Sequence, residues 1–95
     1  MARINADTLT CLATLCEKLR VIPGLVETKP GIFYVKRIPM LHFHETDSGV
    51  VADLKCVTPN VAGFDRFAID TAHEKQVLVT ETTARCRCLL EKQTQ

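Results

Sequence analysis

The sequence predicts an α+β fold, with a single antiparallel β-sheet of about four strands and its helices on one face, in the order α-β-β-β-β-α. Three observations support this prediction: an amphipathic pattern near the start, short β-branched and aromatic segments in the middle, and a helix-capping pattern before the last third. The chain has 95 residues. We therefore expect residues 1–95 to form one domain around one modest core.

The first predicted element is an amphipathic helix over residues 6–20. Apolar side chains recur there at spacings of three and four residues, at Leu9, Leu12, Cys16 and Leu19. Such spacing is typical of a helix with one apolar face. Asn5 or Asp7 can cap its N-terminus, because their side chains accept hydrogen bonds from free backbone N–H groups. Pro23 cannot continue a helix and Gly24 permits a turn, so these two residues end the element.

Four strands are predicted in the middle of the chain. They cover residues 32–35, 40–45, 50–57 and 64–69. These segments are rich in β-branched and aromatic residues, which favour strands. The breaks before and between them carry proline, glycine and other turn-forming residues, at Lys29-Pro30-Gly31, Pro39, Thr46-Asp47-Ser48-Gly49 and Thr58-Pro59-Asn60.

Residues 76–90 carry two conflicting signals. The segment 77–83 is rich in β-branched residues, which are stiff in helices and favour a strand. Just before it, Thr71 and Glu74 have the spacing of a capping box, which marks a helix N-terminus. The capping box is the more specific signal, since propensity is a weak guide. We therefore predict a helix that begins at Ala72 and keep a strand as the alternative.

A turn over residues 46–49 predicts how two strands pair, with His42 opposite Asp53. Side chains alternate across a sheet, so each strand contributes to two faces. One face collects Leu41, Phe43, Ala52, Leu54 and Cys56, together with Phe33 and Val35. The other collects His42, His44, Val51, Asp53 and Lys55, together with Ile32, Tyr34 and Met40. We expect the first face to pack against the helices, because a slip of one residue would bury the polar set. The second face is then open and half apolar, which predicts self-association, most simply as a homodimer.

The open side of the sheet also carries the candidate site. The predicted ligand-binding residues are Tyr34, His42, His44, Asp53 and Lys55. Two imidazoles project from one strand beside a carboxylate on its neighbour, and this donor set of His42, His44 and Asp53 suits zinc or iron. An H-x-H pair alone is a weak motif, and a hydrogen-bonded polar sheet face needs no metal. We therefore expect no cofactor and keep a zinc or iron site on these three residues as the alternative.

The sequence predicts a binding protein rather than an enzyme, and no residue is assigned as catalytic. His42 and Asp53 could act as a base and its orienting carboxylate. A nucleophile is missing, because Ser48 has no elbow motif around it and Cys56 is expected on the core face. The predicted function is a non-enzymatic, self-associating interaction module. The alternative is a metal- or small-ligand-binding protein, enzymatic or not, centred on the two histidines.

The composition argues against nucleic-acid and membrane partners. The formal net charge is +1 and the basic residues are scattered, whereas nucleic-acid binding needs a basic patch. No apolar run approaches the roughly 18 residues of a membrane span, and the start lacks the apolar core of a secretory signal, so we expect a cytoplasmic protein. The five cysteines are then expected as free thiols. Cys11, Cys16 and either Cys86 or Cys88 are predicted in the core.

Four segments of the chain together resemble a known group of proteins. They are Phe33-Tyr34-Val35-Lys36, Met40-Leu41-His42-Phe43-His44-Glu45, Gly49-Val50-Val51-Ala52-Asp53-Leu54-Lys55 and Phe64-Asp65-Arg66-Phe67. This pattern resembles small uncharacterised bacterial proteins with an F-L-H-F-H-E-D-x-x-G-L-x-A-D-[LV]-[KR] core followed by F-x-R-F. The resemblance covers residues 30–75 and implies a soluble, cytoplasmic, small α+β domain without an established activity. The sequence departs from the pattern at Thr46 and in the tail at residues 84–89.

Overall fold

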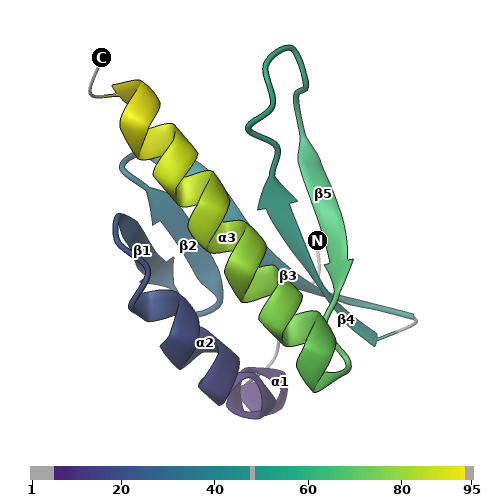
Figure 1. The fold of residues 1–95 in the computed structure, drawn as a ribbon. Helices are drawn as coiled ribbons and strands as arrows, with labels where there is room; N and C mark the ends of the chain where they lie inside the picture. The colour runs from purple at the N-terminus through teal and green to yellow at the C-terminus, as the bar shows by residue number, and fades with distance from the viewer. Residues whose placement is uncertain (1–5, 48, 94–95) are drawn as a thin grey trace.

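Five consecutive strands form one antiparallel sheet in the order β1-β2-β3-β4-β5 (Figure 1). This computed structural model describes residues 6–47 and 49–93. The strands are β1 (Leu25–Lys29), β2 (Ile32–Val35), β3 (Ile38–Thr46), β4 (Gly49–Lys55) and β5 (Phe64–Ala68). Two short helices, α1 (Ala6–Cys11) and α2 (Ala13–Arg20), precede the sheet, and α3 (Ala72–Gln93) follows it. The predicted α+β fold and its order are confirmed, with one strand more than the four that the sequence predicted.

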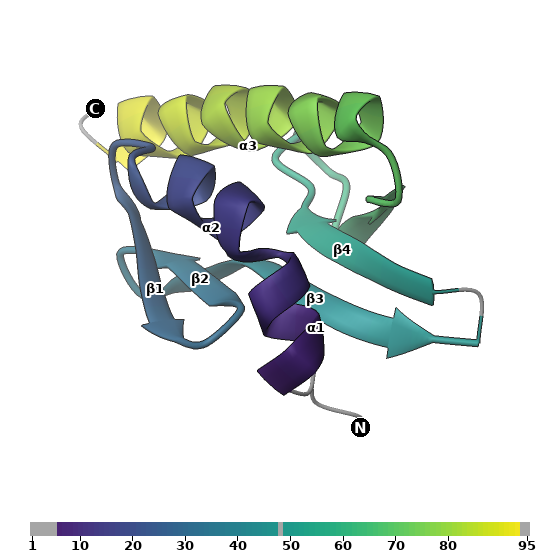
Figure 2. The same cartoon turned by 90° about the horizontal axis from the view of Figure 1, so that it is seen from below.

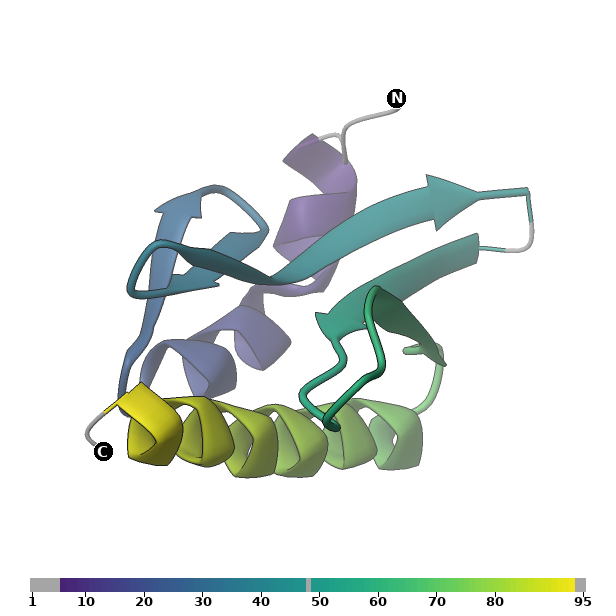
Figure 3. The ribbon, with the colours of Figure 1, turned by 90° about the horizontal axis from the view of Figure 1, so that it is seen from above.

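The molecule has two layers, with helices on one face of the sheet. Figures 2 and 3 show α2 and α3 on the same side of the sheet, while the opposite side has no helix over it in the part of the chain that is described. The core between the layers holds Leu12, Leu15, Cys16, Leu19, Ile22, Leu25, Phe33, Val35, Met40, Leu41, Phe43, Ala52, Leu54, Ile69, Leu78 and Cys86. Burial of this apolar surface is the main stabilising contribution to the fold. Among the described helices, none is long and apolar enough to cross a membrane.

The uncovered side of the sheet is called the open face below. Strand alternation and pairing assign to it Val26, Ile32, Tyr34, His42, His44, Val51, Asp53, Lys55, Phe64, Arg66 and Ala68. It combines apolar, aromatic and charged side chains. The core face and the open face match the predicted partition of the sheet at every position except Met40 and Cys56.

The predicted first helix is present but is interrupted at Leu12, which separates α1 from α2. The φ and ψ of Leu12 are −95° and 6°, outside regular helical values. Cys11 lies four residues before the buried Leu15 but is itself exposed, so its prediction as a core residue was wrong. Cys11 lies outside the buried stripe of the helical segment, which consists of Leu12, Leu15, Cys16 and Leu19. Asn5, one of the two predicted caps, lies outside the described residues.

Strand β1 was not predicted from the sequence. Leu25 is its one buried residue, so the segment carries little apolar alternation. Its strand conformation comes from pairing with β2, which includes an irregularity between Glu27 and Lys29. Glu27 also connects β1 to α2 and to the turn before β2. Its carboxylate accepts hydrogen bonds from Arg20 Nε at 2.7 Å and from the Gly31 backbone N–H at 3.1 Å.

These contacts of Glu27 predict a pH-dependent contribution to stability. Burial acts to raise the pKa of Glu27, but the hydrogen bonds from Arg20 and Gly31 outweigh it and hold the pKa below the ordinary value of 4.5. A lowered pKa stabilises the fold above the unfolded-state value, and this contribution is lost as pH falls through the folded-state value. We expect Glu27→Gln to lower the free energy of unfolding by about 0.5–1 kcal/mol near neutral pH.

Urea unfolding at about pH 7 and about pH 3 measures this effect, because glutamates of ordinary pKa are ionised at the first pH and largely protonated at the second. The difference between wild type and Glu27→Gln should shrink at the lower pH. Glu17→Gln, at an exposed position on α2, is the control and should change little at either pH. An equal deficit of Glu27→Gln at both pH values would contradict the assignment.

A bulge in β3 corrects the predicted position of Met40. Phe33 pairs with Leu41 whereas Tyr34 pairs with Pro39, so Met40 is the extra residue on β3. Met40 and Leu41 are both 0% exposed, although strict alternation would place one of them on each face. The bulge removes the alternation locally, which turns Met40 into the core. The prediction of Met40 on the open face was therefore wrong.

Residues 76–90 form part of the long helix α3, as the capping box indicated. Glu74 Oε1 accepts hydrogen bonds from the backbone N–H groups of Asp70 and Thr71 at 3.0 Å, and Thr71 Oγ1 accepts one from the Glu74 N–H at 3.1 Å. The strand alternative was wrong because one stripe of α3 packs on the sheet. Leu78, Thr82 and Cys86 recur every four residues along that stripe and are buried.

Arg85 links α3 to strands β4 and β5 of the sheet. Its guanidinium donates to the backbone oxygen of Lys55 at 3.1 Å and pairs with Asp65 at 2.9 Å. It also lies 5.7 Å from the centre of the Phe67 ring. Through these contacts the Arg85 guanidinium helps to hold the helical layer on the sheet.

Candidate functional site

The candidate site lies on β3 and β4, where the predicted pairing is confirmed. His42 stands opposite Asp53, and His44 stands opposite Val51. The turn is tighter than expected, because Thr46 already pairs with Gly49, and Thr46 Oγ1 donates to the Gly49 carbonyl at 2.8 Å. This does not alter the register.

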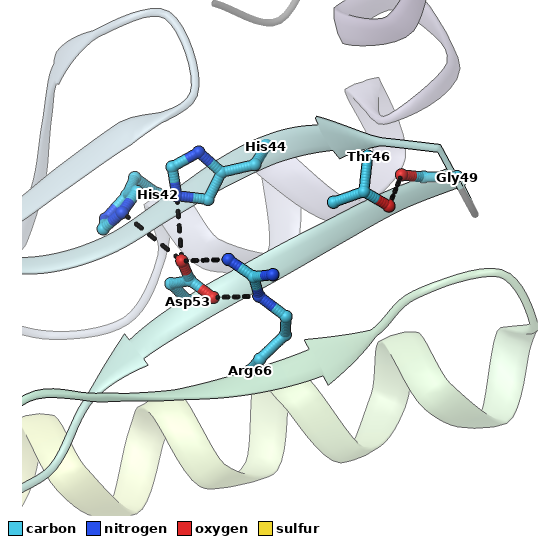
Figure 4. A network of polar contacts seen from close by, with 6 residues as sticks. All are labelled: His42, His44, Thr46, Gly49, Asp53 and Arg66. Carbon is cyan, nitrogen blue, oxygen red and sulfur yellow. Dashed lines mark hydrogen bonds and ion pairs between the residues drawn. The ribbon is translucent and has the colours of Figure 1, made fainter. Parts of the chain in front are cut away.

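Two histidines and one carboxylate converge on a single point (Figure 4). The distance from His44 Nε2 to Asp53 Oδ2 is 2.8 Å, and the distance from His42 Nε2 to the same oxygen is 3.7 Å. The side chains are 28% exposed for His42, 16% for His44 and 13% for Asp53. The His44 contact is a hydrogen bond in length, whereas the His42 contact is longer than one. The three residues thus form a half-buried cluster that solvent reaches from one side.

Arg66 on β5 is a fourth member that the sequence analysis missed. It stands opposite Asp53 in the β4–β5 pairing. Its guanidinium donates from Nε to Asp53 Oδ1 at 3.0 Å and from Nη2 to Oδ2 at 3.3 Å. Such two-point pairing of arginine with a carboxylate fixes the orientation of the carboxylate. The F-x-R-F segment predicted that Arg66 lies on a strand. No short turn joins that strand to β4, so the sequence did not predict which β4 residue faces Arg66.

Aromatic contacts hold the ring of His42. The rings of His42 and His44 meet edge to face, with centres 4.4 Å apart and planes at 83°. The ring of Phe64 also lies near, with its centre 5.2 Å from that of His42 and the planes at 74°. Edge-to-face packing of this kind is favourable for aromatic rings. His42 is therefore positioned by neighbours on β3 and β5, as well as by its own strand.

The electrostatics of the cluster favour an ionised carboxylate beside a neutral imidazole. Burial lowers the pKa of His42, and the charges of His44 and Arg66 lower it further against the opposing effect of Asp53. Burial acts to raise the pKa of Asp53, but the hydrogen bond and charge of Arg66, followed by the charges of His44 and His42, bring it below the ordinary value. A neutral imidazole has a free lone pair, so His42 can accept a hydrogen bond or bind a metal ion.

The other two predicted site residues lie on the same face without joining the cluster. Tyr34 pairs with Pro39, and Lys55 pairs with Phe64. Within the described ranges, neither side chain makes a hydrogen bond or ion pair with His42, His44 or Asp53. They flank the cluster along β2 and β4.

The cluster offers two imidazoles and one carboxylate, which can bind a ligand or exchange a proton. In the described part of the chain, no serine or cysteine contacts either histidine, and Ser48 lies outside it. Cys56 was predicted on the core face, but it follows the end of β4 and is half-buried. A cavity of about 250 Å³ is lined by Pro23, Thr83, Arg87, Leu90 and Glu91, so it lies against α3 in the helical layer.

No protein family, curated protein or solved structure matches the chain. The resemblance to small bacterial proteins therefore stays a prediction that rests on the motif residues.

Proposed function

We propose that this protein is a non-enzymatic binding module that self-associates through the open face of its sheet. The observation that carries the proposal is the apolar surface that extends across this face. Val26 on β1 is 58% exposed and Phe64 on β5 is 43% exposed, and half-buried Ile32 and Val51 lie on the strands between them. Apolar surface that extends over several strands of a small protein is typical of an interaction site.

A second copy of the chain is the partner that the charges of the open face favour. Asp53 on β4 and Arg66 on the edge strand β5 form an ion pair on this face, and Lys55 also lies on β4. In a dimer with two-fold symmetry, the same patch contacts itself. A patch with both signs of charge can be complementary to its own copy, whereas a patch of one sign would repel it.

Sedimentation equilibrium of the tag-free protein tests the proposal. We expect a concentration-dependent mass that reaches that of a dimer. Phe64→Lys and Val26→Lys each place a charge in the apolar part of the open face, and each should weaken association at least about 10-fold. Val77→Lys is the matched control, because Val77 is an exposed valine on α3, in the helical layer.

Two results would overturn the proposal. One is a monomeric mass at every concentration that can be reached. The other is association that Val77→Lys weakens as strongly as Phe64→Lys, since the interface would then include the helical layer. Circular dichroism of each variant shows whether it remains folded and therefore whether its mass is informative.

A further inference from the structure

We propose that His42, His44 and Asp53 bind one divalent transition-metal ion of the zinc or iron(II) class, with the remaining coordination positions open to solvent or to a small ligand. The proposal concerns a site within one chain. It does not depend on self-association.

The distances between the donor atoms suit a metal ion. Zinc lies about 2.0–2.1 Å from its nitrogen and oxygen ligands in a tetrahedral site, which separates neighbouring ligand atoms by roughly 3.3 Å. In the structure, the donor atoms of His42 and His44 lie 3.7 Å and 2.8 Å from Asp53 Oδ2. One donor atom from each of the three side chains lies within 4.8 Å of the others. The two distances to Asp53 Oδ2 differ from this spacing by about 0.4–0.5 Å. The farthest pair of donor atoms would have to approach by up to about 1.5 Å to share one ion.

Regular secondary structure holds the three donors in place. His42 and His44 are two residues apart on β3, so they project from the same face, and Asp53 is on the paired strand β4. Strands position side chains more accurately than loops do. The rings of His42 and His44 already lean on one another and on Phe64, so little side-chain freedom remains to be lost on binding.

Arg66 orients the carboxylate of Asp53, as residues that hydrogen-bond to metal ligands commonly do in metal sites. Its Nε holds Asp53 Oδ1 at 3.0 Å, which leaves Oδ2 turned toward the histidines (Figure 4). Metal-binding carboxylates are commonly oriented by a hydrogen bond to their other oxygen. An ion on Oδ2 would replace the His44 hydrogen bond to that oxygen and the longer 3.3 Å contact from Arg66 Nη2.

The number and type of donors indicate the class of metal. Two imidazoles and one carboxylate favour zinc, iron(II), cobalt or nickel over calcium and magnesium, which prefer oxygen ligands. Three protein ligands leave at least one position open, in contrast to a closed structural site. In a single chain the cluster lies on the uncovered side of the sheet, so an ion and a further small ligand can reach it there.

Titration of the tag-free, metal-free protein with Co²⁺, followed by visible absorption, tests the site directly. We expect one ion per chain and the intense d–d bands of a four- or five-coordinate cobalt ion. Zinc should displace the cobalt and raise the Tm of the wild type. His42→Ala and His44→Ala should each weaken binding by more than the roughly 10–100-fold that loss of an outer-shell partner costs.

His73→Ala is the matched control, because His73 is an exposed histidine at the start of α3 and does not belong to the cluster. It should bind cobalt like the wild type. Asp53→Asn provides a second variant of conserved shape in case an alanine variant fails to fold, and it should also weaken binding. Val26→Lys, which also addresses self-association but lies on β1 away from the three ligands, should keep the metal, so the two proposals can fail separately.

Three outcomes would overturn the metal site. The first is no cobalt binding by folded wild type at millimolar cobalt. The second is full binding by a folded His42→Ala/His44→Ala double variant. The third is a thiolate-to-cobalt charge-transfer band that disappears after alkylation of the exposed Cys11, because the ion would then sit on cysteine.

Discussion

Met40→Ala is expected to lower the free energy of unfolding by about 2–5 kcal/mol, the range for truncating a large, fully buried apolar side chain. Met40 has no exposed surface, and it lies in the core because of the bulge in β3. Truncation removes its burial and leaves a cavity that the neighbouring side chains fill only in part. Urea unfolding followed by circular dichroism measures the loss.

Val51→Ala is the control for Met40→Ala. Without the bulge, Met40 and Val51 would share the open face, and their truncation would have similar, small effects. In the structure only Val51 lies on that face and is half-buried, so Val51→Ala should cost clearly less than Met40→Ala. Similar small losses for both variants would show that β3 continues without a bulge at Met40.

Thr82→Val is expected to stabilise the protein by about 1–2 kcal/mol. Thr82 lies on the buried stripe of α3 and has no exposed surface. Its Oγ1 has no hydrogen-bond partner within the described chain. A buried hydroxyl without a partner loses its hydration on folding and gains nothing in return. Valine has nearly the same shape, so it removes this penalty without leaving a cavity.

Thr83→Val serves as the control for Thr82→Val. The hydroxyl of Thr83 donates to the Val79 carbonyl at 2.7 Å, so valine at that position removes a hydrogen bond that is made. The two adjacent substitutions should therefore differ in sign or at least in size. Thermal unfolding under matched conditions measures both. A loss of stability in Thr82→Val would mean that its hydroxyl finds a partner in solution, for example an ordered water.

The hairpin of β3 and β4 could be predicted residue by residue from the sequence. Both segments alternate apolar and polar residues, and a short turn joins them. A slip of one residue would bury His42 and Asp53 in place of Phe43 and Ala52, which makes that register unfavourable. The short turn fixes the pairing further. For this reason the sequence predicts that His42 stands opposite Asp53, as the structure has it.

Features that depend on tertiary contacts could not be predicted from the sequence. Strand β1 buries only Leu25, and its conformation depends on hydrogen bonds to β2. The bulge at Met40 leaves no mark in the sequence, since alternation continues on either side of it. Arg66 was missed because the longer connection over residues 56–63 does not determine the register of β5, in contrast to a tight hairpin turn. The cluster was therefore predicted without the guanidinium that orients its carboxylate.

The order of the sheet, in which each strand pairs with the next one along the chain, has a consequence for folding kinetics. Every strand pairing joins segments that are close in sequence, so the loops that must close are short and their closure entropy is small. Such local connectivity favours rapid formation of the sheet by successive hairpins. The contacts between α2 and α3 are different, since they join the beginning of the chain to its end. We therefore expect α3, which follows the sheet along the chain, to complete the core when it docks, and the sheet to expose its apolar face until then.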